Sequence, residues 1–182
     1  MAENNIDDSL KKLLLNNIRS VENFPEPGII FKDITPLLKD KHLLELTSRL
    51  LATPFRGQKV DFVVGLESRG FLFGTNLAQD LNAGFIPIRK PNKLPARVES
   101  IDYELEYGTD SFEVHVDALQ KGDNVIIHDD LMATGGTALA ATKLIEKIGG
   151  NVIGYSFVME IEKLKGRKSL SNNVPCHSLL MV

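Results

Sequence analysis

The fold is decided by residues 125–137, which read Val125-Ile126-Ile127-His128-Asp129-Asp130-Leu131-Met132-Ala133-Thr134-Gly135-Gly136-Thr137. The apolar residues at the start predict a buried strand over 124–128, and the paired glycines predict a turn into a helix over 138–148. In open α/β folds, the carboxyl ends of such strands form the edge at which ligands bind. We therefore expect Asp129 and Asp130 at that edge, with both carboxylates accessible to solvent.

The order of groups in this stretch predicts a site for a sugar phosphate. Residues 133–137, here called the phosphate cradle, supply hydroxyls and backbone N–H groups at a helix N-terminus, which favours an anion. Carboxylates beside a phosphate repel it unless they serve another purpose. Asp129 and Asp130 can accept hydrogen bonds from a ribose diol, or hold magnesium directly or through water. Each fragment alone is common at strand ends and helix starts, and only their combination is specific.

Length and composition favour one soluble domain. The chain has 182 residues, of which 43% are apolar and 25% charged, with a net charge of −3. We expect a single domain over 1–182. The balanced charge argues against nucleic acid or a membrane surface as a partner. The lone Cys176 cannot form an internal disulfide, which favours the cytoplasm, and no apolar run approaches the ~20 residues that span a bilayer.

The rest of the chain alternates strand patterns with amphipathic helix patterns. The spacing of apolar residues predicts helices over 6–18, 36–50 and 70–81. The second would have Thr35 as its N-cap and Pro36 at its first position. Apolar runs predict strands over 62–65, 85–88 and 152–159, and Pro87 favours an edge or irregular position for the middle one. This alternation is typical of an α/β fold with a mostly parallel sheet flanked by helices.

Two segments interrupt the alternation. Residues 23–28 contain two prolines and a glycine, so they predict a loop after the first helix. Residues 98–106 and 111–116 flank the turn signal Tyr107-Gly108-Thr109-Asp110, which predicts a β-hairpin. We expect this hairpin to be an inserted flap.

The sequence resembles the type I phosphoribosyltransferases, and within them the branch that uses adenine. The resemblance is carried by five blocks in the family's order, 24–34, 65–71, 88–90 with 93–95, 105–108 and 129–137, which span nearly the whole chain. It implies the type I phosphoribosyltransferase fold, with the β-hairpin flap and an N-terminal hood loop. It also implies a purine salvage reaction that moves the 5-phosphoribosyl group of phosphoribosyl pyrophosphate (PRPP) to N9 of adenine. The products would be AMP and pyrophosphate, with magnesium as the cofactor.

The same resemblance implies a set of site residues. Those for PRPP and AMP are Asp129, Asp130, Ala133, Thr134, Gly135, Gly136 and Thr137, and the two aspartates would also hold the metal, directly or through water. Those for pyrophosphate are Glu67, Ser68, Arg69, Arg89, Lys90 and Lys93, with a cis peptide bond between the first two. Those for adenine are Ile30, Phe31 and Lys32. Glu106 would serve as general acid/base or orient the purine, with Tyr107 secondary and Arg69 as the second catalytic residue.

These residue types suit the reaction. Departure of pyrophosphate builds negative charge on the leaving group, so cations such as Arg69 and Arg89 lower the barrier. Phe31 can stack on the purine, while backbone groups beside it distinguish the amine of adenine from the carbonyl of other purines. Lys32 stands where some relatives have arginine, which keeps the charge without a bidentate contact. The resemblance further implies a homodimer, since the family places part of its basic segment across a subunit interface.

Two alternatives remain open at this point. One is transfer to another base, such as hypoxanthine, guanine, xanthine or orotate. The other is a PRPP-sensing regulator on the same fold, although such regulators often add a DNA-binding domain and lose the flap acid. The remaining polar features receive no role: the four histidines are interpreted as structural or surface residues, 160–168 as a solvated turn, and Cys176 as a small buried side chain.

Overall fold

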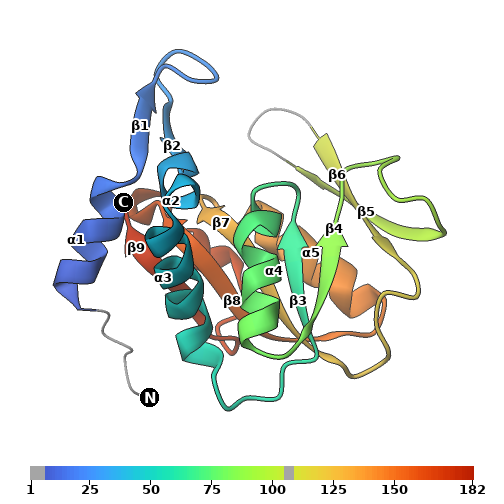
Figure 1. Cartoon of the computed structure of the whole chain (residues 1–182). Helices are drawn as coiled ribbons and strands as arrows, with labels where there is room; N and C mark the ends of the chain where they lie inside the picture. Colours follow the sequence, from blue (N-terminus) through green and yellow to red (C-terminus); the bar gives the residue numbers. More distant parts are fainter. Residues whose placement is uncertain (1–6, 105–108) are drawn as a thin grey trace.

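The structure is a computed structural model that describes residues 7–104 and 109–182. Its centre is a five-stranded sheet in the order β4-β3-β7-β8-β9, in which every neighbouring pair is parallel. The strands are β3 (Phe62–Leu66), β4 (Gly84–Ile88), β7 (Asn124–Met132), β8 (Asn151–Glu160) and β9 (Cys176–Met181). Helices cover both faces of the sheet (Figure 1). The predicted α/β fold with a mostly parallel sheet is confirmed.

The central strand β7 separates two hydrophobic cores. Ile127 points to one face, where it packs in a cluster with Leu144 of α5 (Gly136–Lys147). Ile126 points to the other face and belongs to a cluster with Phe73 of α4 (Gly70–Asp80) and Leu51 of α3 (Lys41–Ala52). Burial on both faces explains why this strand reads as one apolar run. β4, which contains Pro87, lies at the sheet edge as predicted.

The helix predicted over 36–50 differs from the structure in two respects. The helix expected over 36–50 is two helices, α2 (Thr35–Lys39) and α3, because the Asp40 carboxylate accepts from the N–H groups of His42 and Leu43 and starts a new helix. Thr35 is not the N-cap but the first residue of α2. Its N–H and hydroxyl both donate to the Asp33 carboxylate, at 2.9 and 2.8 Å.

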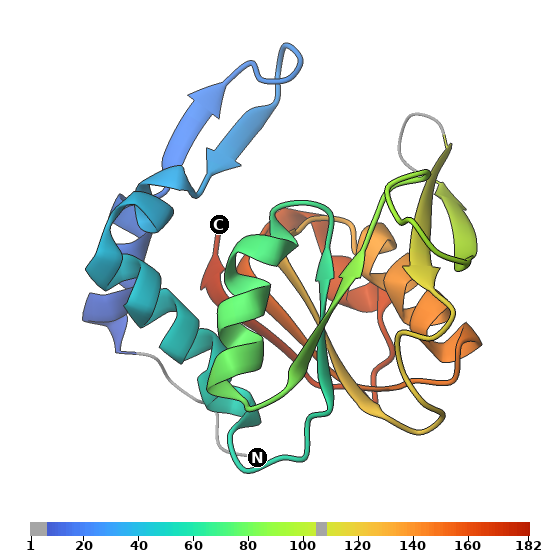
Figure 2. The same cartoon turned by 45° about the vertical axis from the view of Figure 1, so that its right-hand side comes forward.

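Two hairpins project from the carboxyl edge of the sheet, one on each side of it (Figure 2). The hood hairpin pairs β1 (Arg19–Glu22) with β2 (Ile30–Asp33) after α1 (Asp8–Asn16), and the predicted loop 23–28 joins its strands. The flap hairpin pairs β5 (Val98–Glu104) with β6 (Thr109–His115), which confirms the predicted hairpin. The sequence patterns did not predict β1, β2 or β9. Within the described ranges, no helix is long and apolar enough to cross a bilayer.

The prediction of a solvated turn over 160–168 is wrong at its first residue, which is buried. The Glu160 side chain is 3% exposed and pairs with Arg167 at 2.8 Å. Gly166 is buried as well, whereas 162–165 are exposed. Cys176 is partly rather than fully buried. The segment therefore packs against the sheet and is not simply a surface turn.

Candidate active site

The acid pair lies within β7, because this strand runs four residues further than the predicted end at His128. Asp129 is partly exposed, but Asp130 is buried, which corrects the expectation that both carboxylates are open to solvent. The Arg69 Nε lies 3.2 Å from Asp130 Oδ2. Asp129 Oδ1 accepts from the N–H of Asp130 at 2.9 Å. The strand thus places a half-buried carboxylate beside Gly70 and a buried carboxylate against an arginine.

The electrostatics of this pair favour a cationic or hydrogen-bonding ligand. Burial raises the pKa of Asp129 well above its usual range, and the neighbouring charge of Asp130 adds to the increase. Burial also raises the pKa of Asp130, although the Arg69 guanidinium opposes it. Both carboxylates would be stabilised as anions by magnesium or by ribose hydroxyls. Among the described residues, no three metal-binding side chains gather, so a metal here would take other ligands from substrate and water.

The phosphate cradle follows at the end of β7. Gly135 adopts a left-handed backbone with φ of +82° and precedes α5, which begins at Gly136. Ala133, Thr134 and Thr137 line a cavity of about 210 Å³ together with Arg69 and the acid pair. Within the described part of the chain, the N–H groups of 133–137 have no hydrogen-bond acceptor. Apart from Gly136, the residues predicted for PRPP and AMP therefore line one cavity that offers free donors at a helix N-terminus.

The loop between β3 and α4 lies over the acid pair. The peptide bond between Glu67 and Ser68 is cis, as predicted. The loop approaches β7 closely at Gly70, where a Cβ would lie 2.8 Å from the His128 carbonyl oxygen. This contact explains how Arg69 reaches Asp130.

Glu67 organises the neighbouring basic residues. Its carboxylate accepts from Arg89 Nε at 3.0 Å and from the N–H of Lys90 at 2.6 Å. Burial raises the pKa of Glu67, but these two hydrogen bonds outweigh it and hold that pKa below its ordinary value. Arg89 and the Lys90 backbone are thereby fixed beside the cis peptide. Lys93 lies further along the loop and is exposed.

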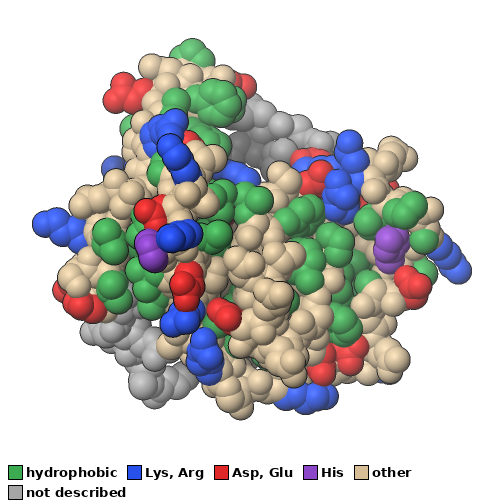
Figure 3. Space-filling model, in the orientation of Figure 1, with side chains coloured by type: hydrophobic (Ala, Val, Ile, Leu, Met, Phe, Trp, Pro, Cys, Tyr) green, Lys and Arg blue, Asp and Glu red, His purple; other side chains and the backbone are tan. Residues whose placement is uncertain are grey.

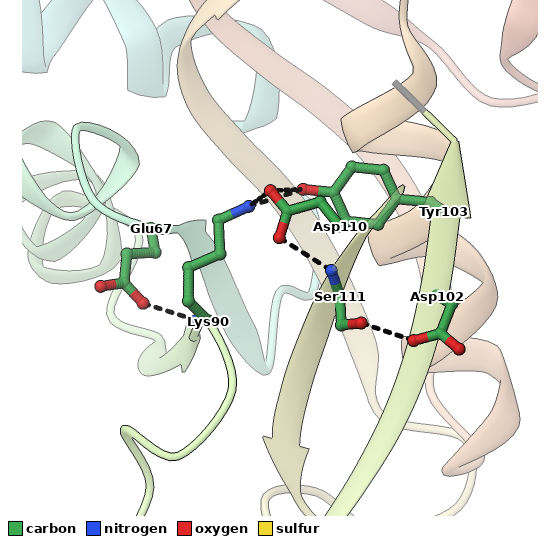
Figure 4. Close-up of polar contacts among 6 residues, drawn as sticks. All are labelled: Glu67, Lys90, Asp102, Tyr103, Asp110 and Ser111. Atoms are coloured by element: carbon green, nitrogen blue, oxygen red, sulfur yellow. Dashed lines mark hydrogen bonds and ion pairs between the residues drawn. The ribbon is translucent and has the colours of Figure 1, made fainter. Parts of the chain in front are cut away.

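The Lys90 side chain turns toward the flap hairpin (Figure 4). Its ammonium pairs with Asp110 and donates to the Tyr103 hydroxyl at 2.8 Å. It also lies 4.8 Å from the centre of the Phe112 ring. In this arrangement Lys90 links the flap to the end of β4. The sequence patterns gave Tyr103 no role and used Asp110 only as part of a turn signal, since the pairing across the hairpin leaves no local signal.

The residues predicted for adenine lie on the hood hairpin. The Phe31 ring packs edge-on against Phe24, with centres 5.2 Å apart, and the Arg69 guanidinium lies 4.7 Å from its centre. Lys32 donates to the Ser20 hydroxyl at 3.0 Å. Ile30 is 56% exposed, and apolar side chains gather at the tip of the hairpin (Figure 3). The structure thus joins Phe31 to the acid pair through Arg69, whereas Ile30 remains apart.

The flap acid and its neighbour fall in the gap of the described residues. Glu106 and Tyr107 belong to 105–108, between β5 and β6. The roles given to Glu106 and Tyr107 therefore stay predictions. The flanking strands are in register from Glu104 with Thr109 to Val98 with His115.

Comparisons with known proteins agree with this geometry. The phosphoribosyl transferase domain family matches residues 35–174. The chain is 56% identical over 155 residues to an adenine phosphoribosyltransferase of Flavobacterium johnsoniae, covering 85% of this chain and 91% of the relative. A Methanococcus maripaludis relative of the same name is 54% identical over 157 residues, covering 86% and 91%.

Solved structures give the same result. The crystal structure of adenine phosphoribosyltransferase from Rhodothermus marinus superimposes with a TM-score of 0.93 at 49% identity, covering 97% of this chain and all of that one. The Saccharomyces cerevisiae enzyme, solved with an imino-altritol bisphosphate and adenine, has a TM-score of 0.88 at 44% identity. The yeast comparison covers 95% of this chain and 99% of the yeast chain.

Proposed function

The chain belongs to the phosphoribosyltransferase family, and from this premise we propose how its own residues carry the reaction. The activity is purine salvage: the 5-phosphoribosyl group of PRPP is transferred to N9 of adenine, giving AMP and pyrophosphate. The observation that carries the assignment of residues is the single cavity shared by the phosphate cradle, the acid pair and Arg69.

The cradle binds the 5′-phosphate of PRPP and AMP. Its N–H groups lack partners in the described structure, and the positive end of the α5 dipole lies at the same place. Ala133 and the residues that follow it provide backbone donors, and Thr134 and Thr137 add hydroxyls. Because these donors are fixed before the ligand arrives, binding costs little ordering of the loop.

The acid pair holds the ribose. Asp129, which is partly exposed, accepts hydrogen bonds from the ribose hydroxyls, and both carboxylates stabilise the positive charge that develops on the ring. The same two residues would hold magnesium, directly or through water, because carboxylate oxygens beside substrate phosphates are its usual ligands. When bound, the metal would neutralise charge on the pyrophosphate.

The loop over the acid pair holds the leaving group. Arg69 and Arg89 supply positive charge, and the backbone around Ser68 supplies donors. Glu67 does not face an anion itself; it orients Arg89 through a 3.0 Å hydrogen bond. Lys90 and Lys93 complete the basic segment, and Lys90 would exchange Asp110 for pyrophosphate as the substrate binds.

Adenine binds between the hood and flap hairpins. Phe31 stacks on the purine, and the backbone of Ile30 and Lys32 reads its edge. Glu106 acts as general acid/base near N7 or orients the base, with Tyr107 beside it. Closure of the flap over this site would exclude water while the ribose carries positive charge.

We further propose a cytoplasmic homodimer with one domain in each chain. Exposed leucines on α1 and α4, namely Leu13, Leu15 and Leu72, offer apolar surface for a partner copy. Light scattering on an active sample should show twice the chain mass. An active monomer would contradict the dimer.

The decisive experiment measures AMP formation from adenine and PRPP, with and without magnesium. We expect turnover with adenine that depends on magnesium, and little with hypoxanthine or guanine. A preference for a 6-oxo purine would contradict the assignment of the base site. DNA binding without turnover of any base would instead favour the regulator.

A further inference from the structure

Residues 161–170, here called the brace segment, lie directly behind the phosphate cradle. The segment contains two short 3-10 turns, η2 (Glu162–Leu164) and η3 (Gly166–Ser169), and its last residue, Leu170, is buried in the hydrophobic core on the α5 face of the sheet. Among the described residues that line the cavity, none comes from this segment. The brace segment therefore touches the cradle from outside the ligand space.

Two hydrogen bonds attach the brace segment to the cradle backbone. The N–H of Ile161 donates to the Met132 carbonyl at 2.9 Å. The Ser169 hydroxyl donates to the Thr134 carbonyl at 3.0 Å. The first bond holds the backbone at Met132, immediately before the cradle, and the second holds it at Thr134, inside the cradle.

Between these bonds, two glycines bring the backbones into direct contact. A Cβ on Gly166 would lie 2.3 Å from the Ala133 carbonyl oxygen and 3.0 Å from the Gly135 nitrogen. A Cβ on Gly135 would in turn lie 2.4 Å from the Gly166 carbonyl oxygen. The distances of 2.3 and 2.4 Å to the carbonyl oxygens are too short for a side chain, so this packing requires glycine at each position.

These contacts fix the direction of the cradle's donors. In a trans peptide the C=O and N–H bonds point in opposite directions. The carbonyls of Met132, Ala133 and Thr134 face the brace segment. The N–H groups of the same peptide units, which belong to the next residue in each case, therefore point away from it.

The brace segment is itself anchored to the sheet by Arg167. The Arg167 Nε donates to both carboxylate oxygens of Glu160 on β8, at 3.0 and 2.8 Å. The other guanidinium nitrogens reach the Cys176 carbonyl at 2.6 Å and the Ser178 hydroxyl at 3.3 Å, both on β9. Ser178 also donates to Glu160 at 2.7 Å. A buried carboxylate satisfied in this way holds the segment in one position.

We propose that Gly166 and Ser169 are positioning residues for the 5′-phosphate of PRPP and AMP. They touch no substrate, and they act by holding the carbonyls of Ala133 and Thr134 so that the cradle's N–H groups face the ligand. Arg167 and Glu160 keep them in place. This inference rests on the proposed role of the cradle and extends it to a segment outside the site.

The first test is Ser169→Ala, which removes one hydrogen bond from an exposed side chain. We expect the KM for PRPP and the Kd for AMP to rise about 3- to 10-fold, the size associated with one neutral hydrogen bond. The KM for adenine should stay within about twofold of the wild-type value, since the hood hairpin is untouched. The matched control is Ser171→Ala, whose hydroxyl accepts one hydrogen bond among the described residues, from the N–H of Asn173 at 3.4 Å. It should leave both KM values unchanged.

The second test is Gly166→Ala, which forces the two backbones apart. We expect the KM for PRPP to rise about 10- to 100-fold. If this variant does not fold, Ser169→Ala decides alone. An unchanged KM for PRPP in Ser169→Ala, or an equal rise in the KM for adenine, would overturn the inference. Absence of AMP formation by the wild-type chain would instead refute the proposed function, so the two failures are distinguishable.

Discussion

The phosphate cradle and the hood hairpin are built in opposite ways. The cradle lies between a buried strand and a helix, and its backbone touches the brace segment so closely that Gly135 has no room for a side chain. The hood hairpin has two short strands, and all of residues 22–30 are exposed. One region is held on several sides, whereas the other is held mainly at its base.

This difference fits the ligand proposed for each region, the 5′-phosphate for the cradle and the adenine base for the hood hairpin. A phosphate is the same in substrate and product, so fixed backbone donors suit it throughout the reaction. A base enters as a flat free molecule and leaves attached to the sugar, so it suits a peripheral hairpin that presents an aromatic ring. Arg69 connects the two regions, because it contacts both Asp130 and Phe31.

The comparison is tested most severely by Gly135→Ala. The new Cβ would meet the Gly166 carbonyl and would require a φ of +82°, which alanine rarely adopts. We expect kcat/KM for PRPP to fall about 100- to 1,000-fold, as measured by steady-state kinetics. The control is Gly122→Ala, which has a φ of +91° but open space around it. Equal losses in both variants would show that backbone strain, not the brace contact, is responsible.

Between pH 6.5 and 4, the stability contributed by the cradle's strand should depend on pH through His128, whereas the hood hairpin contains no histidine. Burial lowers the pKa of His128 to about 4, from an ordinary value of 6.5. Stability is then undiminished above pH 6.5 and decreases as the pH falls toward 4, because the unfolded chain takes up the proton first. The loss from this residue reaches about 3 kcal/mol.

Urea unfolding of metal-free protein at several pH values measures this effect. Compared with the wild type, His128→Leu should lose less stability between pH 6.5 and 4. The raised pKa values of Asp129 and Asp130 act in the opposite direction in both proteins, so the comparison isolates His128. Identical pH profiles for His128→Leu and wild type would refute the assignment.

Asp130→Asn should disturb the link between the two regions. Arg69 would lose its buried ionic partner, and we expect kcat/KM for PRPP to fall about 10- to 100-fold, with a smaller rise in the KM for adenine. Kinetics with each substrate varied in turn would measure both effects. Wild-type values for PRPP would remove Asp130 from the ribose site.

The smallest effect is expected in the hood itself. Phe31→Ala removes the stacking ring, and the KM for adenine should rise about 5- to 20-fold while the KM for PRPP stays unchanged. Ile29→Ala, an exposed apolar residue on the same hairpin, serves as the control. A PRPP effect as large as the adenine effect would show that the regions are not separable.

The sequence predicted best where one segment carries its own signal. The apolar run of β7, the glycines after it and Pro87 at the sheet edge all reflect local patterns, and each agrees with the structure. The break at Asp40 was missed because a capping aspartate looks like any other polar residue within an amphipathic pattern. The strands of the hood show no apolar alternation, because none of their residues belongs to either hydrophobic core.

Pairing between residues far apart in the sequence limited how much of the site could be predicted. Burial of Glu160 depends on Arg167 and on β9, and the position of Lys90 depends on Asp110 across the flap. Charged residues with such partners read as surface residues until the partner is known. The acid pair and the cradle were found because they are adjacent in the chain, whereas the brace segment was not.

The order in which the chain is synthesised gives the brace segment another consequence. The cradle leaves the ribosome before residues 161–170 and before β9, to which Arg167 is bound. At typical elongation rates this interval is on the order of a few seconds. A nascent chain that already contains the whole cradle would still bind its ligand poorly, because the brace segment is not yet in place. Substrate should therefore assist late steps of cotranslational folding and not early ones.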